Sequence, residues 1–115
     1  MIAENVVNNA YEQLCAKEKY LFDASYSLAN TKDALETEVS KGLADGVIIG
    51  KNQQLRDAAA RELLPGLFGA VTKAQNVYDK TRLDYTLAQN EVSRVRLIIR
   101  LMEITKGEND GLETK

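Results

Sequence analysis

The chain has 115 residues, an apolar fraction of 44%, a formal net charge of −2 and no histidine. This length fits a single domain, and the charge provides no bulk attraction to nucleic acid or to an anionic membrane. The lack of histidine removes the commonest general base and metal ligand, and the single Cys15 cannot form an internal disulfide. One proline and no tryptophan favour long helices. We therefore expect an all-α protein with no catalytic residue, metal or cofactor.

A first apolar ladder runs through residues 3–41, which contain no proline or glycine. Its members recur in alternating steps of three and four residues, as expected for one helix face held against another helix. They are Val7, Ala10, Leu14, Lys17, Leu21, Ala24, Leu28, Thr31 and Leu35. The stem of Lys17 can lie along such a seam while its amine reaches solvent. The spacing predicts a helix over about 3–41.

Residues 42–52 are expected to form a glycine-rich tip. Gly46 and Gly50 permit turns, and Asn52 can cap the start of a following helix. Arg56 can reach back to the carbonyls that end the first helix. An alternative interpretation is an anion site at Lys51, but the segment lacks the Ser or Thr that ends a phosphate-binding loop. The structural interpretation is therefore favoured.

A short helix is expected over 53–63, with a break or sharp kink at Pro65, because proline lacks an N–H group and crowds the preceding turn. A second long helix is expected over 67–106. Its ladder is Leu67, Val71, Ala74, Tyr78, Thr81, Tyr85, Ala88, Val92, Val95, Ile99 and Met102. The two ladders predict one domain over 1–106, a coiled-coil-like antiparallel helical hairpin, followed by a frayed tail at 107–115.

Both long helices also carry apolar residues outside their ladders. On the second helix Leu97, Leu101 and Ile104 lie nearly opposite the ladder, and the first helix carries a stripe of Tyr11, Cys15, Phe22 and Tyr26. A helix that is apolar on opposite sides is normally buried on both. These faces predict a homo-oligomer, most simply a dimeric four-helix bundle, or a surface for another protein. The alternative is that the short helix and the chain ends cover them.

Three arginines, Arg94, Arg96 and Arg100, lie in a stretch without acidic residues. Residues 1–16 contain only acidic charges, Glu4 and Glu12. Antiparallel pairing would bring these two stretches together. The alternative is that the arginines and Lys51 contact phosphate groups of a nucleic acid or nucleotide.

The tip, residues 46–56, resembles that of small uncharacterised helical proteins encoded by phages and prophages. These proteins tend to carry Gly-x-Ile-x-Gly-Lys-Asn-x-x-x-Arg between two long helices rich in Ala, Leu and Glu. They often finish in an Arg- and Leu-rich segment similar to residues 94–102. Pro65 departs from the uninterrupted second helix of that group. The resemblance implies a phage origin and, through it, binding to host or phage machinery, including defence systems.

The main functional prediction is a non-enzymatic phage accessory protein that oligomerises and binds another protein. Its expected location is the cytoplasm, in a bacterial host, because no secretory signal or membrane-spanning run is visible. One alternative is a nucleic-acid or nucleotide-binding protein that uses the arginine-rich helix. The other is a chaperone similar to prefoldin, for which Val47, Ile48 and Ile49 would have to form a strand.

Overall fold

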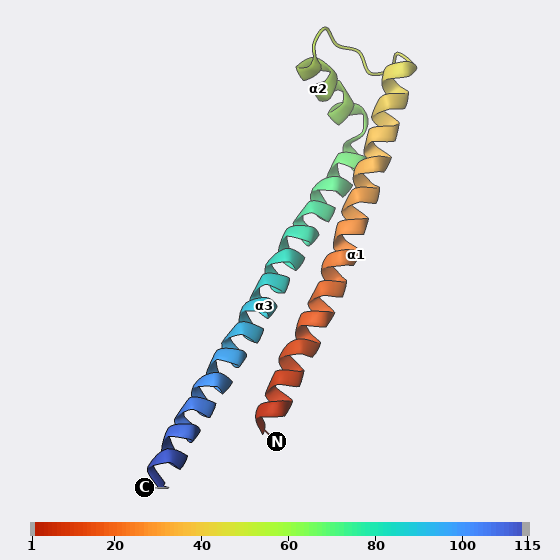
Figure 1. The fold of residues 1–115 in the computed structure, drawn as a ribbon. Helices are drawn as coiled ribbons and strands as arrows, with labels where there is room; N and C mark the ends of the chain where they lie inside the picture. Colours follow the sequence, from red (N-terminus) through yellow and green to blue (C-terminus); the bar gives the residue numbers. More distant parts are fainter. Residues whose placement is uncertain (1, 114–115) are drawn as a thin grey trace. The chain divides into compact units, whose positions relative to one another are not determined.

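The structure is a computed structural model that describes the backbone of residues 2–113 and the side chains of residues 4–107. Three helices follow one another: α1 (Ile2–Ala44), α2 (Gln53–Leu63) and α3 (Pro65–Glu113) (Figure 1). No strand occurs within residues 2–113. The predicted all-α helical hairpin is therefore confirmed.

Both long helices extend beyond the limits expected from the sequence. α1 continues to Ala44, and α3 begins at Pro65 and continues to Glu113. The first helix thus ends slightly beyond the expected limit near 41, and the second continues through the segment that was expected to fray as far as residue 113; residues 114 and 115 lie outside the described part. Continuation costs little, because each added residue contributes a backbone hydrogen bond and a glycine costs only about 1 kcal/mol.

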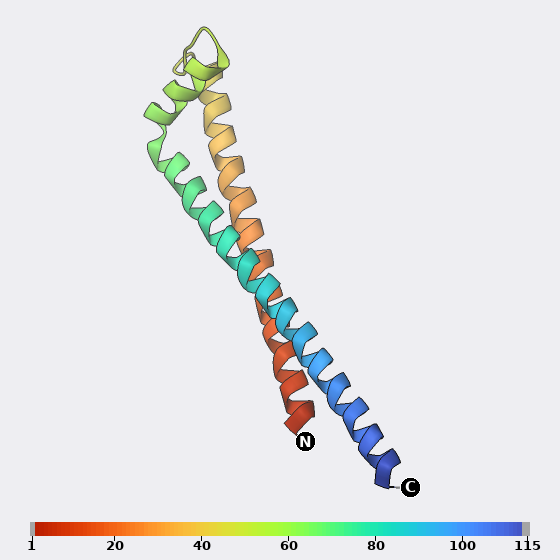
Figure 2. The same ribbon diagram turned by 90° about the vertical axis from the view of Figure 1, so that its left-hand side faces the viewer.

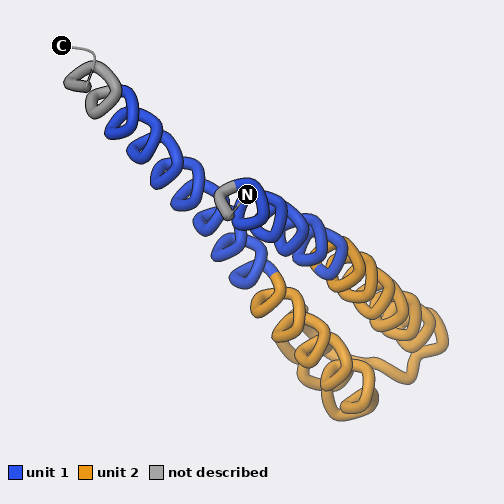
Figure 3. Tube along the Cα trace, turned by 90° about the horizontal axis from the view of Figure 1, so that it is seen from below, with its two compact units in different colours: residues 1–20, 82–115 blue, residues 21–81 orange. Residues whose placement is uncertain are grey.

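The chain is divided into two compact units by its internal contacts (Figure 3). Unit 1 combines Met1–Tyr20 with Arg82–Lys115, and unit 2 is Leu21–Thr81. Each unit contains a stretch of α1 and a stretch of α3, and unit 2 also holds the tip and α2. The expected single domain over 1–106 is better described as these two units. A side chain on a long helix touches only the nearest turns of the facing helix, so a helix pair builds its core locally.

Unit 1 has a small core made by Ala10 of α1 with Val92 and Val95 of α3, all between 4% and 7% exposed. The partly buried side chains packed against it are Val7, Tyr11, Leu14 and Ile99. The small Ala10 side chain lets the two valines approach α1 closely. Met102 is 59% exposed, so its predicted place in the seam was wrong, and the buried seam ends at Ile99.

Unit 2 continues both ladders. Ala24 and Leu28 of α1 are buried, and the ladder residues of α3 in this unit are half-buried. The polar ladder residue Thr81 is half-buried, and its hydroxyl donates to the Val77 carbonyl at 2.7 Å. Its polar atom is thus satisfied within the helix, which leaves the methyl group for packing.

α1 ends in a Schellman motif that reverses the chain (Figure 2). The Val47 N–H donates to the Gly42 carbonyl at 2.9 Å, and the Gly46 N–H donates to the Leu43 carbonyl at 3.3 Å. Gly46 has a φ of +74°, which a residue with a side chain adopts only with strain. Ile48, 4% exposed, then packs on Gly42, where a Cβ atom would lie 2.6 Å from its Cδ1 atom.

The predicted cap of α2 is confirmed. The Asn52 Oδ1 atom accepts from the Leu55 N–H at 2.9 Å. Gly50 lies against the first turn of α2, because a Cβ atom there would be 2.7 Å from the Arg56 backbone nitrogen. The Arg56 side chain is half-buried but makes no hydrogen bond to the end of α1 within the described side chains, so its expected role there was wrong.

α2 and α3 are separate helices divided by Leu64, whose φ and ψ are −122° and 50°. The Leu64 N–H donates to the Ala60 carbonyl at 2.8 Å, and its carbonyl accepts from the Phe68 N–H at 3.2 Å. Pro65 is the first residue of α3, where a missing N–H has no cost. The helix is therefore interrupted at Leu64, which is the break, and not the sharp kink, of the two outcomes expected from the sequence.

Candidate interaction surface

The strongest candidate site is a set of exposed apolar side chains on α3 in unit 1. Leu97, Leu101 and Ile104, predicted from the sequence, are 58%, 54% and 52% exposed. Ile98 and Met102 are exposed as well, and these two line a shallow groove with Leu101, Thr105 and Lys106. Isolated apolar residues are normal on a protein surface, whereas a contiguous patch marks an interaction site.

Two physical reasons leave this patch uncovered. Leu97 and Leu101 lie nearly opposite Val95 and Ile99 on a helix of 3.6 residues per turn, so they point away from α1. In addition, α3 extends past the start of α1 within unit 1 (Figure 1), so the last turns of α3 have no facing helix.

The surface extends further along α3 than the sequence analysis predicted. Leu83 and Leu87 are 58% and 55% exposed on the same side of α3. They were missed because polar residues separate them from Leu97. Counting back from Leu101 in alternating steps of four and three residues would have found them. We name the resulting series the outer ladder: Leu83, Leu87, Asn90, Arg94, Leu97 and Leu101.

The predicted stripe on α1 is divided between the two units. Tyr11, half-buried, and Cys15, exposed, belong to unit 1. Phe22 and Tyr26 belong to unit 2 and are 70% and 64% exposed. α2 therefore does not cover these two aromatic rings, which was the alternative to an interaction surface.

Arg94 is paired within its own helix. Its Nε and Nη2 atoms donate to the Glu91 carboxylate at 3.0 and 2.6 Å. These hydrogen bonds, together with the attraction between the charges, lower the pKa of Glu91 and raise the pKa of Arg94. The pairing was missed because Glu91 lies just before the acid-free stretch that contains the arginines. Both side chains are exposed, so the pair contributes little to stability.

Arg96 lies over the ring of Tyr11, with 5.4 Å between its guanidinium carbon and the ring centroid. The expectation that the acidic start of the chain lies beside the arginine-rich stretch is confirmed by this contact, although Glu91–Arg94 is the only ion pair among the side chains of residues 4–107. The first turns of α1 and the arginine-rich stretch of α3 thus meet through a cation–π contact. Arg100 is exposed.

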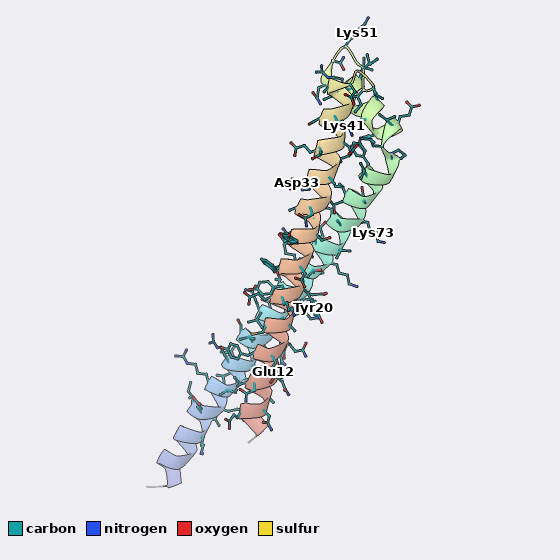
Figure 4. The ribbon with its side chains drawn as sticks, turned by 90° about the vertical axis from the view of Figure 1, so that its right-hand side faces the viewer. Glu12, Tyr20, Asp33, Lys41, Lys51 and Lys73 are labelled. Atoms are coloured by element: carbon teal, nitrogen blue, oxygen red, sulfur yellow. The ribbon has the colours of Figure 1, made fainter. Side chains whose placement is uncertain are left out.

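Lys51 is exposed on the tip in unit 2 (Figure 4), whereas the three arginines belong to unit 1. The predicted anion contacts are therefore not gathered in one unit. Within the described part of the chain, His, Cys, Asp and Glu residues form no group of three that could hold a metal ion. A search of the same part found no helix with the length and apolar character needed to cross a membrane.

Comparisons with known proteins add no family to this description. No protein-family model matches the chain, and neither a curated protein nor a solved structure matches it.

Proposed function

We propose that this chain is a non-enzymatic interaction protein that self-associates and binds a second protein through its exposed apolar faces. The observation that carries the proposal is the exposure of Leu83, Leu87, Leu97 and Leu101 along one side of α3. Transfer of such side chains out of water is favourable, at about 25 cal/mol per Å² of apolar area. A partner that covers them therefore gains free energy from each leucine.

The second partner is proposed to be a host or phage protein, in keeping with the resemblance of residues 46–56 to phage-encoded tips. Phe22 and Tyr26 are the favoured contacts, because large aromatic side chains often dominate the free energy of binding at protein interfaces. They lie on α1 in unit 2, whereas the exposed leucines of α3 belong to unit 1. One surface can thus serve self-association while the other serves the second partner.

The alternatives have less support. Arg94 and Arg96 are already engaged by Glu91 and Tyr11, which reduces what they can offer to phosphate groups. For a prefoldin-like chaperone, residues 47–49 would have to form a strand, and they form loop instead. Neither alternative therefore has an observation of its own in its favour.

Self-association is tested by light scattering on the purified chain and on a Leu101→Glu variant. We expect a mass of at least twice 12.8 kDa for the native chain and a smaller mass for the variant. A native chain that is monomeric at high micromolar concentration would contradict the proposal. The exposed Gln89, which lies on neither the seam nor the outer ladder, provides the control Gln89→Glu.

Binding of a second protein is tested by capture from bacterial lysate with the native chain and with a Phe22→Ser, Tyr26→Ser double variant. Both rings are exposed, so the variant retains the seam. We expect a protein that the native chain retains and the double variant loses. Identical captured proteins would contradict the assignment of this surface.

A further inference from the structure

We propose that the outer ladder is a homodimer interface in which the α3 helices of two copies pack antiparallel about the level of residue 92. This inference rests on the proposed self-association and specifies its surface, its orientation and its register. It concerns side chains of unit 1 only. The partner is a second copy of this chain.

The spacing of the outer ladder is that of a coiled-coil seam. Its six members follow one another in steps of four, three, four, three and four residues, which keeps them on one side of a helix. The four leucines are between 54% and 58% exposed. Their side lies nearly opposite Val92 and Val95, which face α1, so a second copy can approach without displacing α1.

The ladder is complementary to itself when it is reversed. An antiparallel partner centred on residue 92 sets Leu83 against Leu101 of the second copy and Leu87 against Leu97. It sets Asn90 against Arg94. In the heptad assignment that this spacing gives, each pair joins an a position to a d position, which is the pairing of antiparallel coiled coils. The contact runs over residues 83–101, a length of about 27 Å at 1.5 Å per residue.

Arg94 selects the orientation. A parallel pair in register would set Arg94 against Arg94 of the second copy, and the two like charges would repel. The antiparallel pair sets each Arg94 beside the Asn90 amide oxygen of the other copy, one residue from Glu91. Each Arg94 guanidinium then has two acceptors: the Glu91 carboxylate of its own helix and the Asn90 amide oxygen of the second copy. A polar residue in an otherwise apolar seam commonly specifies register in this way.

Self-complementarity distinguishes a second copy from an unrelated helix as the partner. A two-fold interface uses the same patch on both subunits, so every contact must occur twice. The outer ladder meets this condition at all six positions, including its two polar ones.

The orientation is tested by disulfide cross-linking in a Cys15→Ser background, which removes the exposed native thiol. Two chains are prepared, one with Leu87→Cys and one with Leu97→Cys, and one carries a tag that changes its mass. We expect cross-linked dimers in the mixture to contain one chain of each kind, with little cross-linking of either chain alone. A third chain with Gln89→Cys is the control and is expected to remain uncross-linked with either.

Each other result has a defined meaning. Cross-linking of each chain with itself would overturn the antiparallel orientation. A dimer by light scattering with no cross-linking at either position would overturn the outer ladder as its interface. Both of these results leave the proposed self-association intact, whereas a monomer by light scattering overturns both.

The affinity provides a second measurement. Leu87→Glu places a carboxylate at two symmetry-related points of the interface, so we expect the dissociation constant to rise at least about 30-fold in sedimentation equilibrium. Gln89→Glu is expected to change it less than about threefold. Leu87 is exposed in the single chain, so helix content by circular dichroism should be unchanged in both variants. Equal dissociation constants for the two variants would contradict the proposal.

Discussion

Unit 1 and unit 2 use the same spacing of seam residues but pack differently. In unit 1 the small Ala10 side chain meets Val92 and Val95, and all three are buried. In unit 2 the stretch of the seam between Ala24 and Ala74 has small side chains on both helices, and an open groove of about 240 Å³ lies there. Its lining residues are Ala24, Ser27, Thr31, Ala70, Lys73, Ala74 and Val77. A periodic pattern therefore sets which faces meet, whereas side-chain size sets how well they fill the space between them.

The two units also differ in how their exposed faces arise. Unit 2 reverses the chain, and Gly42, Gly46, Gly50 and the Asn52 cap belong to that turn. The described residues of unit 1 contain no turn, and α3 there is apolar on two nearly opposite sides. The turn of unit 2 is explained by local hydrogen bonds. The exposed outer side of α3 in unit 1 has no such local explanation, and it is the basis of the proposed self-association.

The largest effect is expected from a charge in the core of unit 1. Val95 is 4% exposed, so Val95→Asp buries a carboxylate without a partner and should cost roughly 3 kcal/mol or more. Amide hydrogen exchange should show loss of protection in unit 1 before the tip of unit 2. The exposed Ser93→Asp is the control. Equal loss of protection in both units would mean that they unfold as one.

The difference in packing predicts opposite effects for the same substitution. Ala10 is 7% exposed, so Ala10→Leu should overfill unit 1 and cost about 1–3 kcal/mol. Ala74→Leu fills part of the groove in unit 2 and should stabilise the chain by about 1 kcal/mol. Urea denaturation compares the two variants. Effects of the same sign would contradict the proposed difference between the seams.

Unit 2 gives a matched pair of glycine substitutions, one in the tip and one in α3. A Cβ atom at Gly50 would lie 2.7 Å from a backbone nitrogen of α2, so Gly50→Ala should destabilise unit 2 by about 1–3 kcal/mol. Gly69 is inside α3 with no atom near its Cβ position, so Gly69→Ala should stabilise by about 0.5–1 kcal/mol. Thermal denaturation by circular dichroism measures both, and equal shifts would contradict the close approach at Gly50.

The smallest effect is expected from the exposed Glu91–Arg94 pair. The pKa of Glu91 in the folded chain is below its ordinary value of 4.5, so the unfolded chain binds more protons in that range. The contribution of the pair is therefore present above about pH 5 and is lost as the pH falls through the lowered pKa. Glu91→Gln should remove this dependence. Native and variant unfolding curves, compared at pH 7 and pH 3, should differ less at pH 3 than at pH 7.

Features with a local cause were predictable from the sequence. Asn52 caps α2, Gly46 reverses the chain and Pro65 separates two helices, because each acts through its own backbone or its immediate neighbours. The outer leucines Leu97 and Leu101 were predictable from their position opposite the ladder. Leu83 and Leu87 were predictable in principle, but two polar residues interrupt the apolar pattern between them and Leu97.

Other features depend on contacts between residues far apart in the chain. The sequence by itself determined the helices, their breaks and the faces that meet, because helical periodicity and backbone chemistry act over a few residues. Only the tertiary structure decided where the seam ends, that Arg96 meets Tyr11 and that unit 2 contains a groove. Those outcomes depend on the axial register of α1 against α3, which no local pattern specifies. The exposure of the outer ladder does not depend on that register, because these residues lie nearly opposite the seam on the same helix.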